Sequence, residues 1–135
     1  MTVSLFGTSY AGLSMTLGGT QGTGDGEFSQ PWGIGVNATG WIFVAEYQNY
    51  RIQLFDNSTD HDFSSHIIDP GVRYNDCYRD SMDVQSGDPC GGNGELNQPL
   101  DITFDSSGNL WVVDMGNHRI QKFDPSGNYV TKFGS

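Results

Sequence analysis

Basic residues are scarce in this sequence. Its 135 residues include 6 Lys and Arg against 16 Asp and Glu, which gives a formal net charge of −10. A field of this sign repels the phosphates of nucleic acids and acidic membrane surfaces. Six scattered cations are too few to build a basic binding face, so we expect no nucleic acid among the partners.

Long apolar runs and helical periodicity are also missing. No stretch has the length and apolar character of a transmembrane segment, so membrane insertion is not expected. Residues 1–15 lack the basic start and unbroken apolar run of a signal peptide. The sequence contains no phosphate loop, serine-nucleophile elbow, zinc motif or haem-attachment motif. These absences favour a protein that is not an enzyme.

What the sequence does contain is repetition. QNYRIQLFD at 48–56 returns as GNHRIQKFD at 116–124, 68 positions later. At this offset residues 24–56 align with residues 92–124 without a gap, and a repeat of this length governs the choice of fold. Identical pairs occur along the whole alignment, among them Gly24/Gly92, Glu27/Glu95, Pro31/Pro99, Ile34/Ile102, Gly40/Gly108, Val44/Val112, Asn49/Asn117, Arg51/Arg119, Gln53/Gln121 and Asp56/Asp124.

The pattern of each copy predicts four short strands. Alternating or β-branched runs of about five residues are bounded by Gly, Asn, Asp and Pro, which is typical of antiparallel strands joined by hairpins. The expected strands are GIGVN, WIFVAE, RIQLFD and DFSSHII (62–68) in the first copy, and DITFD, NLWVVD, RIQKFD and YVTKF (129–133) in the second. The sequence therefore predicts an all-β protein made of four-stranded meanders.

Repeated four-stranded units are the blades of β-propellers. The two copies resemble NHL repeats, whose pattern runs through Gly-x-Phe, Pro, an apolar strand, Asp-x-x-Gly, a second apolar strand and Asn-His-Arg-Ile-Gln. The second copy keeps Asn117, His118 and Arg119, whereas the first has Tyr50 in place of the histidine. The resemblance implies a scaffold that binds other proteins. Some NHL proteins bind RNA through a basic propeller face, which the charge of this chain does not supply.

The chain is expected to hold about two and a half blades. We predict a half blade of two outer strands at 1–19, blade 1 at 20–69, an insertion at 70–91 and blade 2 at 92–135. A short open array leaves apolar end faces in water, here expected to include Ile102, Phe104, Trp111 and Val113. Such a partial propeller is completed either by further chain or by oligomerisation into a ring or filament.

The insertion contains both cysteines, Cys77 and Cys90. We expect a disulfide between them, with two free thiols as the alternative, and a disulfide indicates an oxidising compartment. Asn37 and Asn57 begin Asn-x-Thr triplets in predicted turns and are candidate glycosylation sites. These features together predict an extracellular or cell-surface protein.

The repeated motif contains most of the candidate structural residues. Arg51 and Arg119 follow Glu46 and Asp114 by five positions, which predicts an acid–guanidinium bond that holds each hairpin. His118 is expected to be a packing residue. The other repeated polar positions are Asn49, Asp56, Asn117 and Asp124.

Calcium is the one cofactor that the sequence leaves open. Asp56, Asp60 and Asp62 stand at alternate positions, and oxygen ligands at this spacing suit Ca²⁺. The glycine and the bidentate glutamate of a calcium loop are missing, so a solvated acidic turn is the preferred interpretation, with no cofactor.

The sequence thus favours a non-enzymatic extracellular structural or protein-interaction module that associates with other copies of itself or with other proteins. One alternative is part of a propeller enzyme similar to the peptide-amidating lyase, which needs several histidine ligands that the repeats do not offer. Another is a glycan-binding propeller that uses Trp32 and Trp41.

Overall fold

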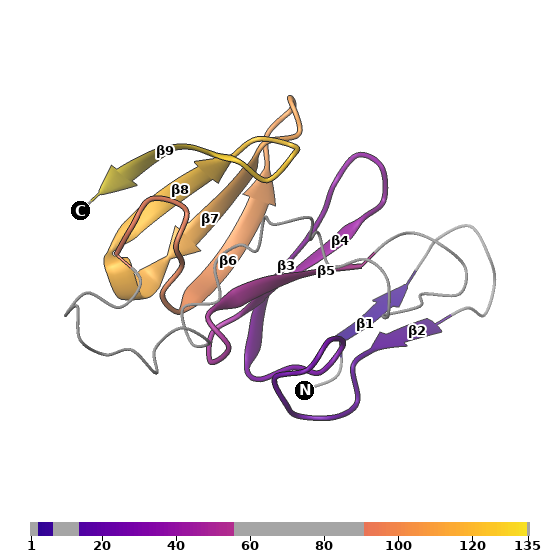
Figure 1. Cartoon of the computed structure of the whole chain (residues 1–135). Coiled ribbons are helices and arrows are strands. Elements are labelled where there is room, and N and C mark those ends of the chain that lie inside the picture. Colours follow the sequence, from indigo (N-terminus) through magenta and orange to yellow (C-terminus); the bar gives the residue numbers. More distant parts are fainter. Residues whose placement is uncertain (1–2, 7–13, 56–90, 135) are drawn as a thin grey trace.

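The computed structural model describes residues 3–6, 14–55 and 91–134. Three antiparallel sheets follow one another in chain order and lie side by side (Figure 1). The nine strands are β1 (Val3–Phe6), β2 (Ser14–Leu17), β3 (Pro31–Val36), β4 (Ile42–Glu46), β5 (Arg51–Phe55), β6 (Pro99–Phe104), β7 (Leu110–Asp114), β8 (Arg119–Phe123) and β9 (Tyr129–Gly134). The prediction of an all-β fold with propeller-like units is confirmed.

Blade 2 is the complete unit, a meander in the order β6-β7-β8-β9. Blade 1 has β3, β4 and β5, and its expected fourth strand at 62–68 lies outside the described residues. At the N-terminal side β1 pairs with β2, with Val3 opposite Leu17. The only helical element of the described part is a 3-10 turn, Met115–Asn117, which joins β7 to β8.

The two blades repeat each other in register and in backbone conformation. Ile34 faces Val44 in blade 1, and Ile102 faces Val112 in blade 2, and both first strands carry the same irregularity just after their proline. Matched residues also adopt the left-handed region, which is uncommon for residues other than glycine. These are Gln30 and Gln98, with φ of 49° and 54°, and Tyr50 and His118, with φ of 55° and 53°.

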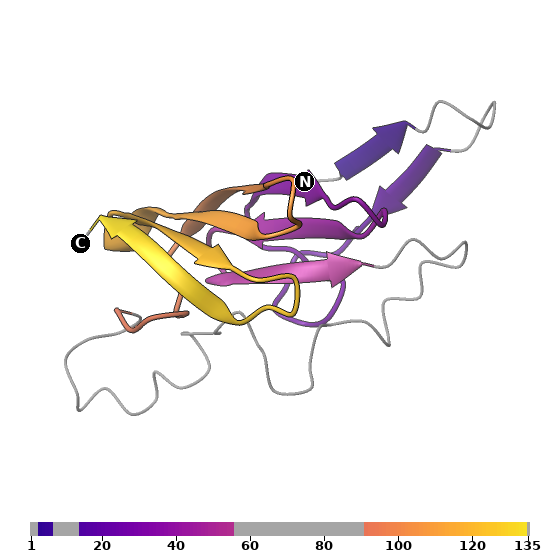
Figure 2. The same ribbon diagram turned by 90° about the horizontal axis from the view of Figure 1, so that it is seen from above.

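The larger core lies between the two blades. It joins Phe43, Ala45, Ile52 and Leu54 of blade 1 to Leu96, Ile102, Leu110, Val112 and Phe123 of blade 2. The Phe43 and Phe104 rings meet edge to face at 4.7 Å, a preferred geometry for aromatic pairs. Figure 2 shows the two sheets lying one against the other.

Two glycines allow β3 to approach β6. A Cβ atom at Gly33 would lie 2.7 Å from Asp101 Cα, and one at Gly35 would lie 3.2 Å from Phe104 Cε2. The face of β3 that lies against blade 2 therefore has glycines in place of side chains. The larger side chains Trp32, Ile34 and Val36 lie on the opposite face, because successive side chains of a strand alternate between faces.

A second core covers the other side of blade 1. Leu17 of β2 packs with Phe28, Ile42, Val44 and Phe55, and all five are buried. The Phe28 and Phe55 rings meet edge to face at 5.7 Å. Every residue of β4 is buried because it lies between the two cores.

The expected set of exposed end-face residues is partly wrong. Ile102 is only 6% exposed because it faces blade 1, and Phe104 is half-buried against the same core. The opposite face of blade 2 is the open one, with Ile120 at 42% and Phe133 at 57% exposure. Among the described residues, no helix has the length and apolar character needed to cross a membrane.

Candidate functional site

Each blade contains a buried carboxylate with several donors around it. In blade 2 this group is Asp114, whose side chain has no solvent exposure. It accepts hydrogen bonds from Arg119 Nε at 2.6 Å, Asn117 Nδ2 at 2.9 Å, Gln121 Nε2 at 3.0 Å and the Asn97 amide at 2.6 Å. A buried charge is tolerated only when it is paired and hydrogen-bonded, as this one is.

Arg119 uses its remaining donors on the chain that precedes the blade. Its terminal nitrogens donate to the carbonyl oxygens of Gly91, Gly92 and Glu95 at 2.7–2.8 Å. Gln121 Nε2 also donates to the Glu95 carbonyl. Together with the bond from Nε to Asp114, these contacts are four hydrogen bonds, by which the planar guanidinium fixes the segment before β6 to the β7–β8 hairpin.

Blade 1 repeats this arrangement with glutamate in place of aspartate. Glu46 Oε2 accepts from Arg51 Nε at 2.5 Å and from Gln53 Nε2 at 2.8 Å, while Oε1 accepts from Asn49 Nδ2 at 2.6 Å. Arg51 donates to the carbonyls of Thr23, Gly24 and Glu27, which match the acceptors of Arg119 position by position. We call these sets, Glu46-Asn49-Arg51-Gln53 and Asp114-Asn117-Arg119-Gln121, the polar clamps.

The structure thus brings four of the predicted motif residues, Asn49, Arg51, Asn117 and Arg119, into the polar clamps. The two glutamines were missed as members, although their identity at the 68-residue offset was a usable signal. Gln121 has no solvent exposure and Gln53 is 3% exposed. The chemistry of the clamps is that of a cross-link, because the carboxylate and the guanidinium join the second hairpin of the blade to the segment that precedes its first strand.

Asp124 and Asp105 cap hairpin turns. Asp124 Oδ1 accepts from the amides of Ser126 and Asn128, both at 2.9 Å. The Asn128 side chain donates to the same carboxylate, and these bonds hold the pKa of Asp124 below its usual value. Asp105, which sequence reasoning missed, has its pKa lowered chiefly by the Asn109 side chain.

The prediction that His118 is a packing residue is wrong. Its side chain is exposed, and its backbone, with φ of 53° and ψ of 40°, ends the 3-10 turn in the left-handed conformation. Tyr50 takes the same backbone conformation at the matching position. This position therefore serves the turn, and its side chain can change from histidine to tyrosine.

Asn37, predicted as a glycosylation site, caps a turn of blade 1. Its Oδ1 accepts from the amides of Thr39 at 3.0 Å and Trp41 at 2.9 Å. The other candidates of that kind, Asn57, Cys77 and Cys90, and the calcium candidates Asp56, Asp60 and Asp62, lie outside the described residues. Within the described ranges, no three His, Cys, Asp or Glu side chains gather as a metal site would require.

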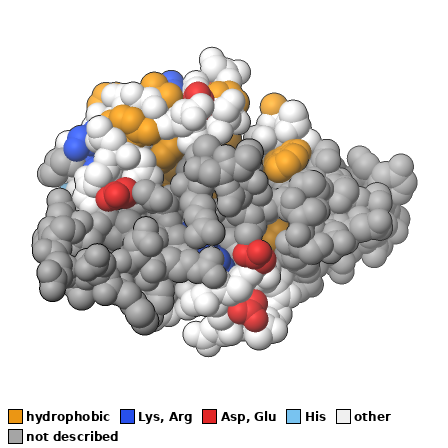
Figure 3. Space-filling view, in the orientation of Figure 1, with side chains coloured by type: hydrophobic (Ala, Val, Ile, Leu, Met, Phe, Trp, Pro, Cys, Tyr) orange, Lys and Arg blue, Asp and Glu red, His pale blue; other side chains and the backbone are white. Residues whose placement is uncertain are grey.

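In the described part of the chain, two apolar surfaces are exposed. The blade-2 outer face consists of Trp111, Val113, Ile120 and Phe133, which share one side of β7, β8 and β9. Trp111 stacks on Phe133 at 5.8 Å, and Lys122 Nζ lies 4.8 Å from the Trp111 ring centre. Hydrophobic side chains are visible at the surface over β6–β9 in Figure 3.

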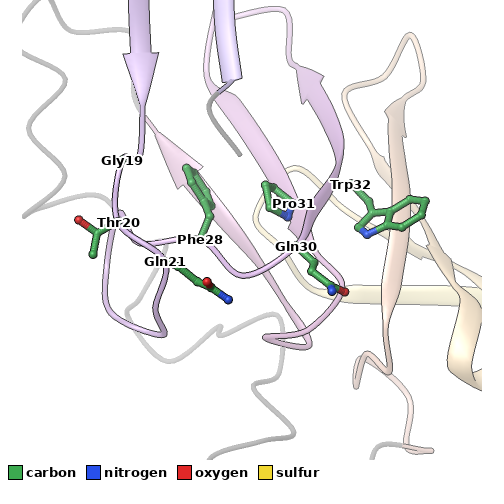
Figure 4. Close-up of a pocket in the computed structure, with 7 residues that line it drawn as sticks. All are labelled: Gly19, Thr20, Gln21, Phe28, Gln30, Pro31 and Trp32. Atoms are coloured by element: carbon green, nitrogen blue, oxygen red, sulfur yellow. The ribbon is translucent and has the colours of Figure 1, made fainter.

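The second surface lies on β3. Trp32, Ile34 and Val36, which we call the β3 stripe, are 64%, 38% and 52% exposed. A hollow of about 520 Å³ adjoins Trp32 (Figure 4) and is lined by Gly19, Thr20, Gln21, Phe28, Gln30, Pro31 and Trp32. Large apolar side chains gathered at a protein surface mark interaction sites more often than isolated ones do.

Comparison with known proteins gives the same repeat. Residues 96–123 match the NHL repeat family. The chain is 41% identical over 51 residues to the rat E3 ubiquitin-protein ligase TRIM71, a match that covers 36% of this chain and 6% of the relative. It is 30% identical over 141 residues to the Drosophila melanogaster protein brain tumor, covering 86% of this chain and 13% of that protein.

A third relative, the human NHL repeat-containing protein 3, is 25% identical over 150 residues, covering 91% of this chain and 43% of its own length. The chain thus spans less than half the length of each of these relatives.

Solved structures show the fold. A luciferin-regenerating enzyme superposes with a TM-score of 0.56 and 13% identity over 90% of this chain and 33% of its own. Regucalcin, a calcium-binding protein from Agrobacterium tumefaciens, superposes with a TM-score of 0.53 and 14% sequence identity. The match covers 91% of this chain and 34% of the regucalcin chain. At these identities the likeness concerns the β-propeller fold alone.

The comparisons overturn the predicted location. TRIM71, brain tumor and the Caenorhabditis elegans proteins lin-41 and ncl-1 are intracellular proteins, which contradicts the extracellular or cell-surface prediction. That prediction depended on a disulfide and on glycan acceptors, and both require the oxidising secretory route. Two cysteines in one loop and two Asn-x-Thr triplets are too common to establish this route.

Proposed function

We propose that this NHL-repeat chain of β-propeller fold is a protein-interaction module without catalytic activity of its own. The observation that carries the proposal is the division of roles between its side chains. The buried polar groups of the repeat bind one another and the backbone inside each blade, whereas large apolar side chains remain open on the blade-2 outer face.

The chemistry of this face suits another protein. Trp111, Ile120 and Phe133 supply aromatic and aliphatic surface, and Lys122 supplies one cation beside the tryptophan. Interfaces are enriched in aromatic residues with a polar rim, and a few buried aromatic anchors provide most of the binding energy. The net charge of −10 favours partners with a basic rim around an apolar centre.

A surface variant tests the proposal. Proteins captured by the chain from an intracellular extract are purified and their Kd is measured by calorimetry. Ile120→Asp combined with Phe133→Asp should weaken binding by at least about 10-fold, which corresponds to about 1.4 kcal/mol. Ser106→Asp, which also adds negative charge but at an exposed hairpin tip, should leave Kd unchanged.

Unfolding of each variant by denaturant is measured as well, so that weaker binding is not confused with loss of the fold. Both variants should unfold at nearly the same denaturant concentration as the parent chain, because all three positions are exposed. Equal binding by the parent and the Ile120→Asp/Phe133→Asp chain would show that the blade-2 outer face is not the interaction surface.

A further inference from the structure

The repeat places the two dipeptides of the chain that are most prone to cyclise at one matched position. Asn93–Gly94 is its one Asn-Gly pair, and Asp25–Gly26, 68 positions earlier, is its one Asp-Gly pair. Both Asn93 and Asp25 are exposed. In such a pair the glycine nitrogen can attack the neighbouring side-chain carbonyl carbon and form a succinimide, because glycine has no Cβ atom to block the approach.

Each dipeptide forms the centre of a type II turn. In blade 2 the Glu95 amide donates to the Gly92 carbonyl at 3.2 Å, and Gly94 has φ of 87°. Blade 1 repeats the turn, with φ of 74° at Gly26. A type II turn needs positive φ at its third residue, which favours glycine there, and it gives the preceding residue ψ of about +120°. At this angle the Gly94 nitrogen points away from the Asn93 side chain, so the ring can close only after the turn opens.

The glutamine of each polar clamp holds the glycine nitrogen in place. The Gly94 amide donates to Gln121 Oε1 at 2.9 Å, and the Gly26 amide donates to Gln53 Oε1 at 3.0 Å. A hydrogen bond donated by the neutral amide favours that form over the anion. The nitrogen that would attack in succinimide formation therefore keeps its proton and its orientation while the clamp is closed.

We propose that Asn93–Gly94 is a deamidation site that the polar clamp of blade 2 holds closed. When the Gln121 contact opens, the Gly94 nitrogen loses its proton and attacks Asn93 Cγ. The new C–N bond forms, the Cγ–Nδ2 bond breaks, and Nδ2 leaves with the proton as ammonia. Water then opens the succinimide at either carbonyl and gives aspartate or isoaspartate. This site is separate from the blade-2 outer face, and its test does not depend on partner binding.

The two products differ in their effect on the clamp. Aspartate fits the turn, because Asp25 occupies the matching position in blade 1. Isoaspartate instead adds one methylene group to the main chain between Gly92 and Gly94. The Arg119 bond to the Gly92 carbonyl and the Gln121 bond to the Gly94 amide then cannot both form. Formation of isoaspartate therefore unlocks the clamp of blade 2.

Peptide mapping by mass spectrometry measures the rate of the reaction. The full chain is kept at mildly alkaline pH and digested with trypsin at intervals, and fragment ions show which asparagine has converted. A capped synthetic peptide of residues 91–98 gives the rate without the clamp. Asn93 should convert at least about 10-fold more slowly in the folded chain, because reaction requires local opening. Equal rates in the chain and the peptide would overturn the proposal.

A pair of matched variants tests the role of the clamp. Gln121→Met keeps the length of the side chain but lacks the amide oxygen that holds Gly94. It should raise the rate at Asn93 about 5-fold or more, the equivalent of one lost hydrogen bond. Gln53→Met makes the same change in blade 1 and should leave this rate unchanged. Equal acceleration by both variants would overturn the proposal, because general unfolding would then control the reaction.

The stability of the modified chain tests the unlocking. The protein is aged in urea, where the clamp is open, and refolded, and the deamidated form is isolated by anion exchange because it has gained negative charge. It should unfold at a lower urea concentration than an Asn93→Gln chain that has received the same treatment. Asn93→Asp without ageing should unfold at the concentration of the parent. A deamidated, isoaspartate-containing chain as stable as the treated Asn93→Gln chain would refute the unlocking.

Discussion

At the scale of single residues, the polar clamps convert a buried charge into a link between distant parts of a blade. Asp114 and Arg119 have side-chain exposures of 0% and 1%, whereas Arg51 is 15% exposed beside Glu46. Removing one partner of a buried ion pair costs about 3–5 kcal/mol, since the remaining charge has neither water nor counter-charge. The cost falls when water can reach the site.

We therefore expect Arg119→Ala to lower the free energy of unfolding by about 3 kcal/mol or more. Arg51→Ala should cost less, because solvent can reach the Glu46 clamp through its more exposed arginine. Urea denaturation followed by circular dichroism measures both. Arg119→Lys is the matched control, as it keeps the charge but loses the fork that reaches Gly91 and Gly92.

If the clamp is a structural cross-link, its loss must lower the stability of the fold. An Arg119→Ala chain that melted like the parent but no longer bound its partner would contradict that role. A loss of stability in Arg119→Lys that is smaller than in Arg119→Ala would measure the contribution of the guanidinium hydrogen bonds. The remaining difference between the two variants would measure the contribution of the positive charge.

The turn aspartates give the protein an acid-sensitive element. Hydrogen bonds from Asn109 and Asn128 hold the pKa of Asp105 and of Asp124 below the ordinary value of 3.8. A carboxyl whose pKa is lower in the folded state stabilises that state above its unfolded pKa, and this contribution disappears as the pH falls through the folded pKa. Stability should therefore decline below about pH 4.

Asp105→Asn should reduce this pH dependence. The amide keeps an acceptor for the Ser107 and Asn109 backbone but cannot titrate. We expect the difference in melting temperature between about pH 5 and about pH 3 to be smaller in the variant than in the parent. Ser106→Ala, which alters the same turn without removing a titrating group, should keep the full difference.

At the scale of elements, the contact between β3 and β6 depends on two glycines in different surroundings. A side chain at Gly33 would meet backbone atoms, Asp101 Cα at 2.7 Å and the Leu100 carbonyl oxygen at 2.9 Å. A side chain at Gly35 would meet only the rim of the Phe104 ring and the Ile102 side chain. Backbone cannot move aside without separating the blades, whereas a ring can turn by a few tenths of an ångström.

We predict that Gly33→Ala destabilises the chain by about 1–3 kcal/mol, the usual range for overpacking. Gly35→Ala should cost clearly less, partly offset by the reduced entropy of the unfolded chain, which amounts to about 0.4–1 kcal/mol. Denaturant titration gives the two values. Hydrogen exchange should show that the loss in Gly33→Ala is concentrated in β3 and β6, and an even loss over all strands would contradict the contact as described.

At the scale of the whole molecule, two open apolar faces oppose a net charge of −10. Charge repulsion between copies acts over about 20 Å or more at low ionic strength and over about 8 Å at 0.15 M salt. Contact between apolar faces is not weakened by salt. Added salt should therefore weaken the charge repulsion between copies while leaving the apolar contact between them unchanged.

We expect self-association of the isolated chain to increase with ionic strength, as measured by light scattering. Ile120→Asp/Phe133→Asp should remain monomeric under the same conditions, because it removes an open face and adds charge. A parent chain that stays monomeric of 14.8 kDa at every salt concentration, and that does not bind a hydrophobic dye, would show that the open faces do not associate.

The sequence by itself determined the strands, the repeat and the acid–guanidinium pair of each polar clamp. Those features depend on residues close together in the chain, so the local alternation of apolar residues and the five-residue spacing from acid to arginine were enough to predict them. The same reasoning predicted that Arg119 lies beside Asp114, but it did not predict the acceptors Gly91 and Gly92, because these lie 28 and 27 positions earlier in the chain.

Only the tertiary structure decided which faces are covered. Ile34 and Ile102 are the same residue at the same place in the repeat, yet they are 38% and 6% exposed. The pattern of a strand shows which side chains share a face, but the cover over that face comes from a neighbouring sheet whose position is not encoded locally. For this reason Ile102 was predicted to be open and is buried, while the β3 stripe was recognised as an open surface only once the blades were placed beside each other.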